Sequence, residues 1–124
     1  MTSVVQTLTP AHAIIEVTHT GEITASDLRA SGKQVLAIAR EENIWHLLTD
    51  CTGATAIPGA IDVLNLISLV DQVDLDTGFR QALLWPDDAQ ARLAFDFWRT
   101  VEANHGLHAR AFGDRDAAIA WLES

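Results

Sequence analysis

Cysteine is almost absent from this chain of 124 residues, which contains only Cys51. A single thiol cannot form a disulfide within the chain, and this composition is typical of proteins in a reducing compartment. The sequence therefore excludes the class of small secreted domains that depend on internal disulfides.

Basic residues are also few. Eight Lys and Arg stand against 17 Asp and Glu, so the formal net charge is −9. The basic residues are scattered singly, and no basic stripe is present that could neutralise a row of phosphates. We therefore expect no nucleic-acid binding and no stable association with an anionic membrane surface.

Long apolar runs are missing as well. No stretch approaches the roughly 18 consecutive apolar residues of a membrane-spanning helix. The first residues, "MTSVVQTLTPAHAIIEV", have no basic segment and no long apolar run, and so do not resemble a signal peptide. We expect a soluble, cytoplasmic protein.

Catalytic motifs are missing too. The sequence has no glycine-rich phosphate cradle, no nucleophile elbow and no evident pair of carboxylates for glycosidic chemistry. On a strand, Cys51 and His46 would lie on opposite faces, which is a poor geometry for a nucleophile and its base. We therefore expect that the protein is not an enzyme.

Metal and cofactor signals are weak. His105 and His108 form an H-x-x-H pair, but Gly106 breaks the helix between them and no third ligand is near. The alternating acidic residues of 71–78, "DQVDLDTG", lack the internal glycine and the distal glutamate of a calcium loop. The sequence predicts neither a metal site nor a cofactor.

What is present is an ordinary globular composition, 48% hydrophobic, cut into short elements by turn residues. Strands are predicted within 3–9, 12–20, 44–50, 78–86 and 107–113, and helices within 21–43, 59–73, 87–106 and 115–124. Strands separated by helices pair in parallel through right-handed crossovers, and the opening hairpin adds an antiparallel strand. The sequence predicts a single α/β domain over residues 1–124, with a mixed five-stranded sheet and helices packed against it.

Helix boundaries carry local signals. Thr24 is a good N-cap, and Asp27 can complete a capping box with it. Ile23 and Leu28 are placed to form a hydrophobic staple around that cap. Asn43 is a suitable left-handed terminator of the same helix.

Two later helices carry predicted core residues. Ala94, Phe97, Trp98 and Val101 recur at helical spacing within 87–106. Trp121 is predicted to pack into the core from the last helix. Asp87 or Asp88 is expected to cap the first of these helices, and Asp114 the last.

The central stretch "LLTDCTGATAIPGAIDVLNL", residues 47–66, predicts a strand, a loop and a helix start. Ligands of α/β proteins usually bind at such a junction. The predicted binding residues are Asp50, Cys51, Thr52, Gly53, Pro58 and Gly59. An anion could bind there, because a helix start exposes unpaired N–H groups. The alternative is that Pro58 and Gly59 only start the helix.

The predicted helix at 59–73 has apolar residues outside its core face. Ile61 and Leu64 fall among polar residues, with Asn65 and Ser68 on the same side. Exposed apolar residues of this kind can mark a contact surface. We therefore expect these four residues to form an interface, in a homodimer or with another protein partner.

The order of elements around "LLTDCTGATAIPGAIDVLNL", together with the tail "LHARAFGDRDAAIAWL", resembles the STAS domain family. The similarity is to its SpoIIAA-like branch, the anti-sigma-factor antagonists, and extends from about Val4 to Leu122. In those antagonists a kinase phosphorylates a serine in an Asp-Ser-Ser-Gly motif after the third strand. Here Ile57, Pro58 and Gly59 occupy that position, so the resemblance implies a member without the phosphoacceptor.

Three hypotheses of function follow. The first is a non-enzymatic STAS-like regulatory module that acts through protein–protein contact. The second is a module that binds a small apolar or acyl ligand, because STAS-like folds are similar to the lipid-carrying CRAL-TRIO group; Trp85, Phe95 and Trp98 would then line a cavity. The third is an enzyme that uses the loop from Asp50 to Gly59, and it has the least support.

Overall fold

The computed structural model describes residues 3–8, 11–58, 78–104 and 108–124, with the side chains of 98, 99 and 101–104 excepted. The helix expected at 59–73 lies outside the described residues. The same is true of the predicted interface residues Ile61, Leu64, Asn65 and Ser68.

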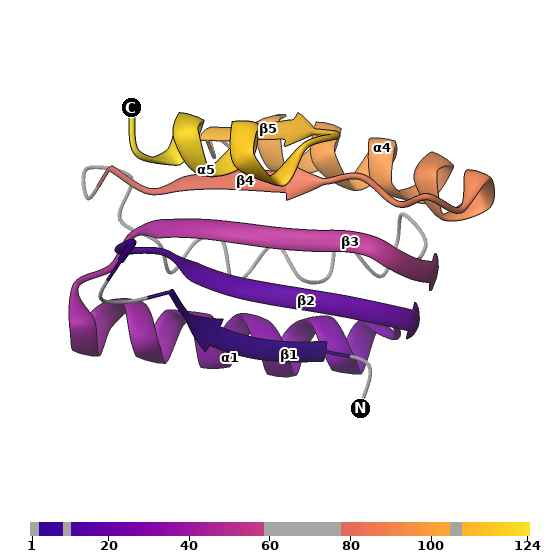
Figure 1. Ribbon diagram of the computed structural model, residues 1–124. Helices are drawn as coiled ribbons and strands as arrows, with labels where there is room; N and C mark the ends of the chain where they lie inside the picture. The colour runs from indigo at the N-terminus through magenta and orange to yellow at the C-terminus, as the bar shows by residue number, and fades with distance from the viewer. Residues whose placement is uncertain (1–2, 9–10, 59–77, 105–107) are drawn as a thin grey trace.

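The described strands form one sheet, in the order in which they follow along the chain (Figure 1). They are β1 (Ser3–Thr7), β2 (Ile15–Glu22), β3 (His46–Ala56), β4 (Arg80–Leu84) and β5 (His108–Phe112). β1 pairs with β2 in antiparallel fashion, and the pairs β2–β3, β3–β4 and β4–β5 are parallel. The predicted α/β fold with a mixed five-stranded sheet is therefore confirmed.

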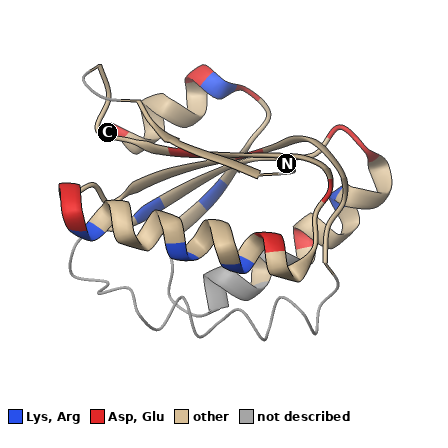
Figure 2. Ribbon diagram, turned by 90° about the horizontal axis from the view of Figure 1, so that it is seen from below, with Lys and Arg blue, Asp and Glu red and all other residues tan. Residues whose placement is uncertain are grey.

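Helices lie on both faces of this sheet. α1 (Ala25–Glu42) and α4 (Ala89–Asn104) pack on one face, and α5 (Arg115–Leu122) packs on the other. Figure 2 shows α1 and α5 on opposite sides of the strands. Because both faces are covered, the middle strands carry apolar side chains on both sides, as parallel strands usually do.

The apolar core is divided by the sheet into two layers. On the α5 face, a buried cluster joins three strand residues and Ile14, which directly precedes β2, to two residues of α5. Its members are Ile14, Leu48, Ala82, Leu84, Ala118 and Leu122. On the other face, Val35 and Ala39 of α1 pack on β2 and β3, and Phe95 of α4 packs on β3 and β4. Burying a side chain such as Phe95 or Leu122 completely contributes about 1.5–3 kcal/mol to stability.

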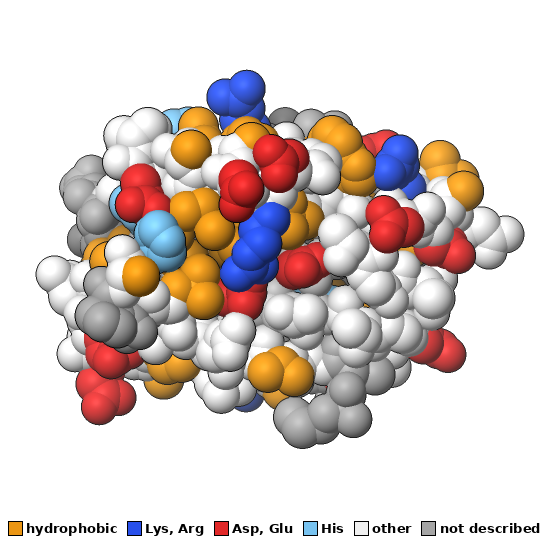
Figure 3. Space-filling view, in the orientation of Figure 1, with side chains coloured by type: hydrophobic (Ala, Val, Ile, Leu, Met, Phe, Trp, Pro, Cys, Tyr) orange, Lys and Arg blue, Asp and Glu red, His pale blue; other side chains and the backbone are white. Residues whose placement is uncertain are grey.

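A buried carboxylate also links α5 to the sheet. Glu16 of β2 is only 3% exposed. It accepts a hydrogen bond from Gln6 Nε2 at 2.7 Å and another from Arg115 Nη1. Figure 3 shows the face of the molecule that α5 covers, with charges of both signs beside apolar side chains. Arg115 is therefore needed to balance a charge that the fold has taken out of water.

The predicted helix ends are confirmed. Thr24 Oγ1 accepts from the Asp27 N–H at 3.1 Å, and Asp27 Oδ2 accepts from the Thr24 N–H at 3.0 Å, which completes the capping box. Asn43 ends α1 with φ 55° and ψ 45°, the left-handed conformation. Asp88 caps α4 and Asp114 caps α5, each accepting from backbone N–H groups of the first turn.

The predicted core stripe of α4 is wrong in phase. Phe97 is 45% exposed, whereas Ala91 and Phe95 are buried. The cap at Asp88 and the buried Pro86 fix how the helix starts, and this start turns positions 91 and 95 toward the sheet. Ala94 is half-buried, and the side chains of Trp98 and Val101 lie outside the described residues.

Trp121 packs against the core cluster on the α5 face but remains half-buried. Its ring lies 5.7 Å from that of Phe112 and 5.3 Å from that of His108, and Arg80 stacks on it at 5.5 Å. Trp121 was predicted to lie in the core, and it lies at the border of the core.

The left-handed cap generates a stability prediction. We expect Asn43→Ala to lower the free energy of unfolding by about 1–2 kcal/mol, because alanine resists a positive φ. The change also removes the hydrogen bond from Trp45 Nε1 to Asn43 Oδ1, which is 2.9 Å long. Asn43→Gly accepts the same φ and should cost clearly less. Urea unfolding of both variants measures this; equal losses would contradict it.

Candidate functional site

The predicted loop after Asp50 is wrong, because β3 continues through it to Ala56. Asp50, Cys51, Thr52 and Gly53 therefore lie in a strand. From Thr18 to Thr20, β2 advances two residues while β3 advances three, from Asp50 to Gly53. A second irregularity follows at Gly21 and Glu22. These bulges let β3 continue where the residue types predicted a turn.

The first bulge is held by Asp50. Its Oδ1 accepts from the Thr52 backbone N–H at 2.9 Å and from Thr52 Oγ1 at 2.7 Å. These are the local bonds with which aspartate commonly forms turns, here made inside a strand. Thr52 and Gly53 are both exposed, so the usual alternation is broken at this point. The bulge thus presents Asp50, Thr52 and Gly53 at the surface.

Cys51 does not join that surface. It is 1% exposed and packs with Ile23, Leu83 and Phe95 on the face opposite Asp50. This agrees with the expectation that His46 and Cys51 lie on opposite faces. The thiol contributes to the core, and solvent does not reach it.

The loop from β4 to α4 lies beside the bulge. The Asp87 N–H donates to the Thr52 carbonyl oxygen at 3.3 Å, and the Trp85 N–H donates to the Phe112 carbonyl oxygen at 3.3 Å. Arg92 stacks on the Trp85 ring at 5.4 Å, and its Nε donates to the Pro86 carbonyl oxygen at 3.2 Å. The ends of β3, β4 and β5 are thereby joined into one surface.

We call this surface the carboxyl edge, because the parallel strands β2 to β5 all end there. Its residues are Glu22, Thr24, Asp27, Asp50, Thr52, Gly53, Trp85, Asp87, Asp88, Gly113 and Asp114. Asp and Glu lie in its loops and helix starts (Figure 2). Ligands of open α/β sheets usually bind at this edge.

The carboxyl edge is acidic, and its helix starts are occupied. Asp88 and Asp114 cap α4 and α5, and Asp27 binds the N–H of Thr24 at the start of α1. An anion would have to displace these carboxylates and approach further ones. Anion binding is therefore disfavoured at the starts of these three helices. The anion site predicted at the start of the helix at 59–73 lies outside the described residues and stays a prediction. Pro58 is buried, and Gly59 lies outside the described residues.

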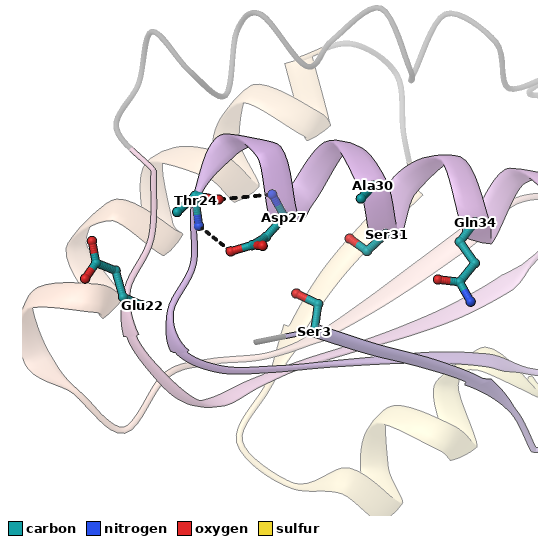
Figure 4. Close-up of a pocket in the computed structure, with 7 residues that line it drawn as sticks. All are labelled: Ser3, Glu22, Thr24, Asp27, Ala30, Ser31 and Gln34. Carbon is teal, nitrogen blue, oxygen red and sulfur yellow. Dashed lines mark hydrogen bonds between the residues drawn. The ribbon is translucent and has the colours of Figure 1, made fainter. Parts of the chain in front are cut away.

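A hollow of about 600 Å³ opens between β1 and the first half of α1. Its lining comprises Ser3, Glu22, Thr24, Asp27, Ala30, Ser31 and Gln34. Figure 4 shows Ser3 below Ser31, Gln34 one turn further along α1, and the capping pair Thr24 and Asp27 at one end. The volume lies within the range of roughly 300–1,000 Å³ that is usual for small-molecule pockets.

Beneath this hollow lies a buried histidine. His19 of β2 is 3% exposed, and its Nδ1 lies 2.7 Å from Ser3 Oγ. Burial lowers the pKa of His19 to about 4, although the carboxylates of Asp27 and Asp50 act in the opposite direction. The imidazole is therefore neutral near pH 7, and the pair with Ser3 is uncharged.

Sequence reasoning missed this hollow. Neither Ser31 nor His19 is a candidate residue in the sequence analysis. The available signal was the placement of polar side chains on faces that otherwise carry Val17, Leu28 and Val35. Polar residues that recur on an apolar face indicate a place where the helix and the sheet do not pack closely.

The apolar-ligand hypothesis gains no support from Trp85 and Phe95. Phe95 is completely buried in the core, whereas Trp85 lies at the surface against Gly113 and Arg92. Among the described residues, no group of three His, Cys, Asp or Glu side chains is placed to hold a metal ion. No helix of the described part of the chain is long and apolar enough to cross a membrane.

Comparison with known proteins adds a structural match. The crystal structure of an anti-sigma factor antagonist from Mycobacterium paratuberculosis is similar over 99% of this chain and 94% of its own, with a TM-score of 0.64 and 15% identity. No protein-family model matches the sequence. No curated protein matches it at a significant level. The predicted resemblance to anti-sigma-factor antagonists is therefore confirmed for the fold.

The buried imidazole generates a prediction about pH. The unfolded chain binds a proton at His19 near pH 6.5, whereas the folded chain does so only near pH 4. Stability from this site is thus complete above about pH 6.5 and lost as the pH falls toward 4, by roughly 3 kcal/mol at most. Urea unfolding at about pH 7.5 and about pH 5 should show a smaller pH effect in His19→Gln than in the wild type.

His108→Gln, which removes an exposed imidazole, serves as the control and should keep the wild-type pH effect. If His19→Gln also keeps it, the imidazole is not neutral in the folded protein and the prediction is wrong.

Proposed function

We propose that this chain, which has the fold of an anti-sigma factor antagonist, is a non-enzymatic regulatory module that binds a protein partner at the carboxyl edge. The observation that carries the proposal is the concentration of carboxylates there, held in place by the strand ends and helix caps. Asp50 is fixed by Thr52, and Asp87 is tied to β3 through the Thr52 carbonyl. A preorganised charged surface favours a partner of opposite charge.

The expected partner surface is basic. Glu22, Asp87, Asp88 and Asp114 are exposed, and the whole chain has a net charge of −9. Arg92 stacks on Trp85, which leaves an exposed apolar ring among the charges. Tryptophan and arginine are the residue types that most often dominate binding energy in protein interfaces. The edge therefore offers both an anchor and a field that attracts cations.

Self-association is a second part of the proposal. It rests on the sequence pattern of Ile61 and Leu64, with Asn65 and Ser68, all outside the described residues. A two-fold contact between copies would bury such a patch once on each side. We further propose that the protein works in the cytoplasm, as its single cysteine suggests.

The edge can be tested by charge reversal. Asp87→Lys changes an exposed side chain and should weaken binding of the partner about fivefold, more so at low salt. Glu41→Lys makes the same change in charge at the other end of α1 and is the matched control. Quantitative affinity purification from the host, followed by binding measurements with the purified partner, compares the three proteins.

If both variants lose affinity for the partner equally, the effect comes from the net charge of the chain. If both keep the wild-type affinity, the partner binds elsewhere. Either result contradicts the proposed surface.

The absence of the phosphoacceptor gives another prediction. Ile57 and Pro58 carry no hydroxyl group, so the switch known from antagonists has no serine to act on. Protein isolated from its host should therefore have its unmodified mass. Thr52 and Thr55 are exposed and are the nearest hydroxyl groups. Stoichiometric phosphate on either, found by peptide mass spectrometry, would show that regulation by phosphorylation has been kept.

A further inference from the structure

The hollow between β1 and α1 has an unusual chemistry for a contact between a sheet and a helix. A little further along, Val5 and Val35 pack with Ile15 and Val17 in an ordinary apolar layer. At the hollow the same two elements present Ser3, Ser31 and Gln34 instead (Figure 4). Six of the seven lining residues are polar, and none of them is Lys or Arg.

The hydroxyl groups that line the hollow mostly act as acceptors toward it. Ser31 Oγ donates its only proton to the Leu28 carbonyl oxygen at 3.1 Å, so toward the hollow it presents lone pairs. Ser3 Oγ is 2.7 Å from Nδ1 of the neutral His19. In the tautomer that carries its proton on Nε2, Nδ1 accepts a hydrogen bond from the Ser3 hydroxyl, which leaves the lone pairs of Ser3 Oγ for the hollow. Ser31 is buried, so water does not easily donate hydrogen bonds to its lone pairs.

The carboxylates add negative charge at one end. Asp27 Oδ2 accepts from the Thr24 N–H at 3.0 Å, and its carboxylate lines the hollow. Glu22 is exposed at the end of β2 and lines the same hollow. An anion would be repelled by both. A site rich in hydrogen-bond acceptors and negative charge requires a positively charged ligand group that donates hydrogen bonds and accepts none.

We propose that this hollow binds the primary ammonium group of a small amine. An ammonium group has three donors and no acceptor, which matches Asp27, Ser3 and Ser31. Glu22 adds a second carboxylate, and Gln34 is left to bind a polar group further along the ligand. The hollow shares Glu22, Thr24 and Asp27 with the carboxyl edge but does not include Asp87, and its test needs no partner protein.

The test is a titration of the full chain with an amine, monitored by backbone NMR at constant ionic strength. Putrescine is the probe, and 1,4-butanediol is its uncharged counterpart of equal chain length. Putrescine should shift the amides of Ser3, Asp27 and Ser31 in a saturable way, and butanediol should not. Nα-acetyl-lysine amide, which carries the same group on a protein-like stem, shows whether the source is a free amine or a protein side chain.

Two variants locate the site. Glu22→Gln removes one exposed charge and should weaken putrescine binding about tenfold, because charge-assisted hydrogen bonds are the strong ones. Ala30→Phe fills the hollow from an exposed helix position and should abolish binding. Glu41→Gln, at the far end of α1, should leave the affinity unchanged.

Equal shifts with butanediol would overturn the proposal, because charge would then play no part. Unsaturable shifts spread over acidic residues elsewhere would overturn it as well. Binding that survives Ala30→Phe would place the amine outside the hollow. Because the titration contains no partner protein, none of these outcomes decides whether a partner binds at Asp87.

Discussion

Parallel pairing of β2 with β3, β3 with β4 and β4 with β5 is the constraint on which the rest of the structure depends. Each parallel connection must cross a face of the sheet, and α1 and α4, which connect β2 to β3 and β4 to β5, cross the same face. α5 follows the last strand and covers the other face, so the strands in the middle are buried. The same pairing makes all four strands end at one edge. The loops that start α1, α4 and α5 are therefore neighbours, although they lie far apart in the sequence.

Local structure determines what this edge displays. Each of the three described helices begins with a side chain that binds its own first turn, through Thr24 and Asp27, Asp88 and Asp114. Carboxylates stabilise helix starts because they complement the helix dipole. The carboxylates that cap the helices thus also make the edge negative, and this negative charge is the basis for the proposal of a basic partner there.

Much of the fold could be predicted from the sequence because its signals are local. The capping box of Thr24 and Asp27, the terminator Asn43 and the cap Asp114 depend on a few neighbouring residues, and all are confirmed. The length of β3 could not be predicted this way. Asp50 to Gly53 have the composition of a turn, and pairing with the ends of β2 and β4 keeps them in a strand.

The candidate sites show the same division. Asp50, Thr52 and Gly53 were predicted as binding residues and do lie at the carboxyl edge, but Cys51 is in the core. The hollow unites Ser3, Glu22 and Ser31 from three elements, and their juxtaposition depends on tertiary packing. The exposure of Phe97 has a similar origin, since the start of α4 rather than its composition sets the face that is buried.

The most direct test of the carboxyl edge as the working surface is hydrogen exchange of the chain alone and in complex with its purified partner. The proposed arrangement predicts added protection at 50–56, 85–88 and 113–116, where strand ends and helix starts meet. It predicts little change at 39–46, at the opposite end of the sheet. Protection confined to that opposite end or to β1, with none at 85–88, would contradict it.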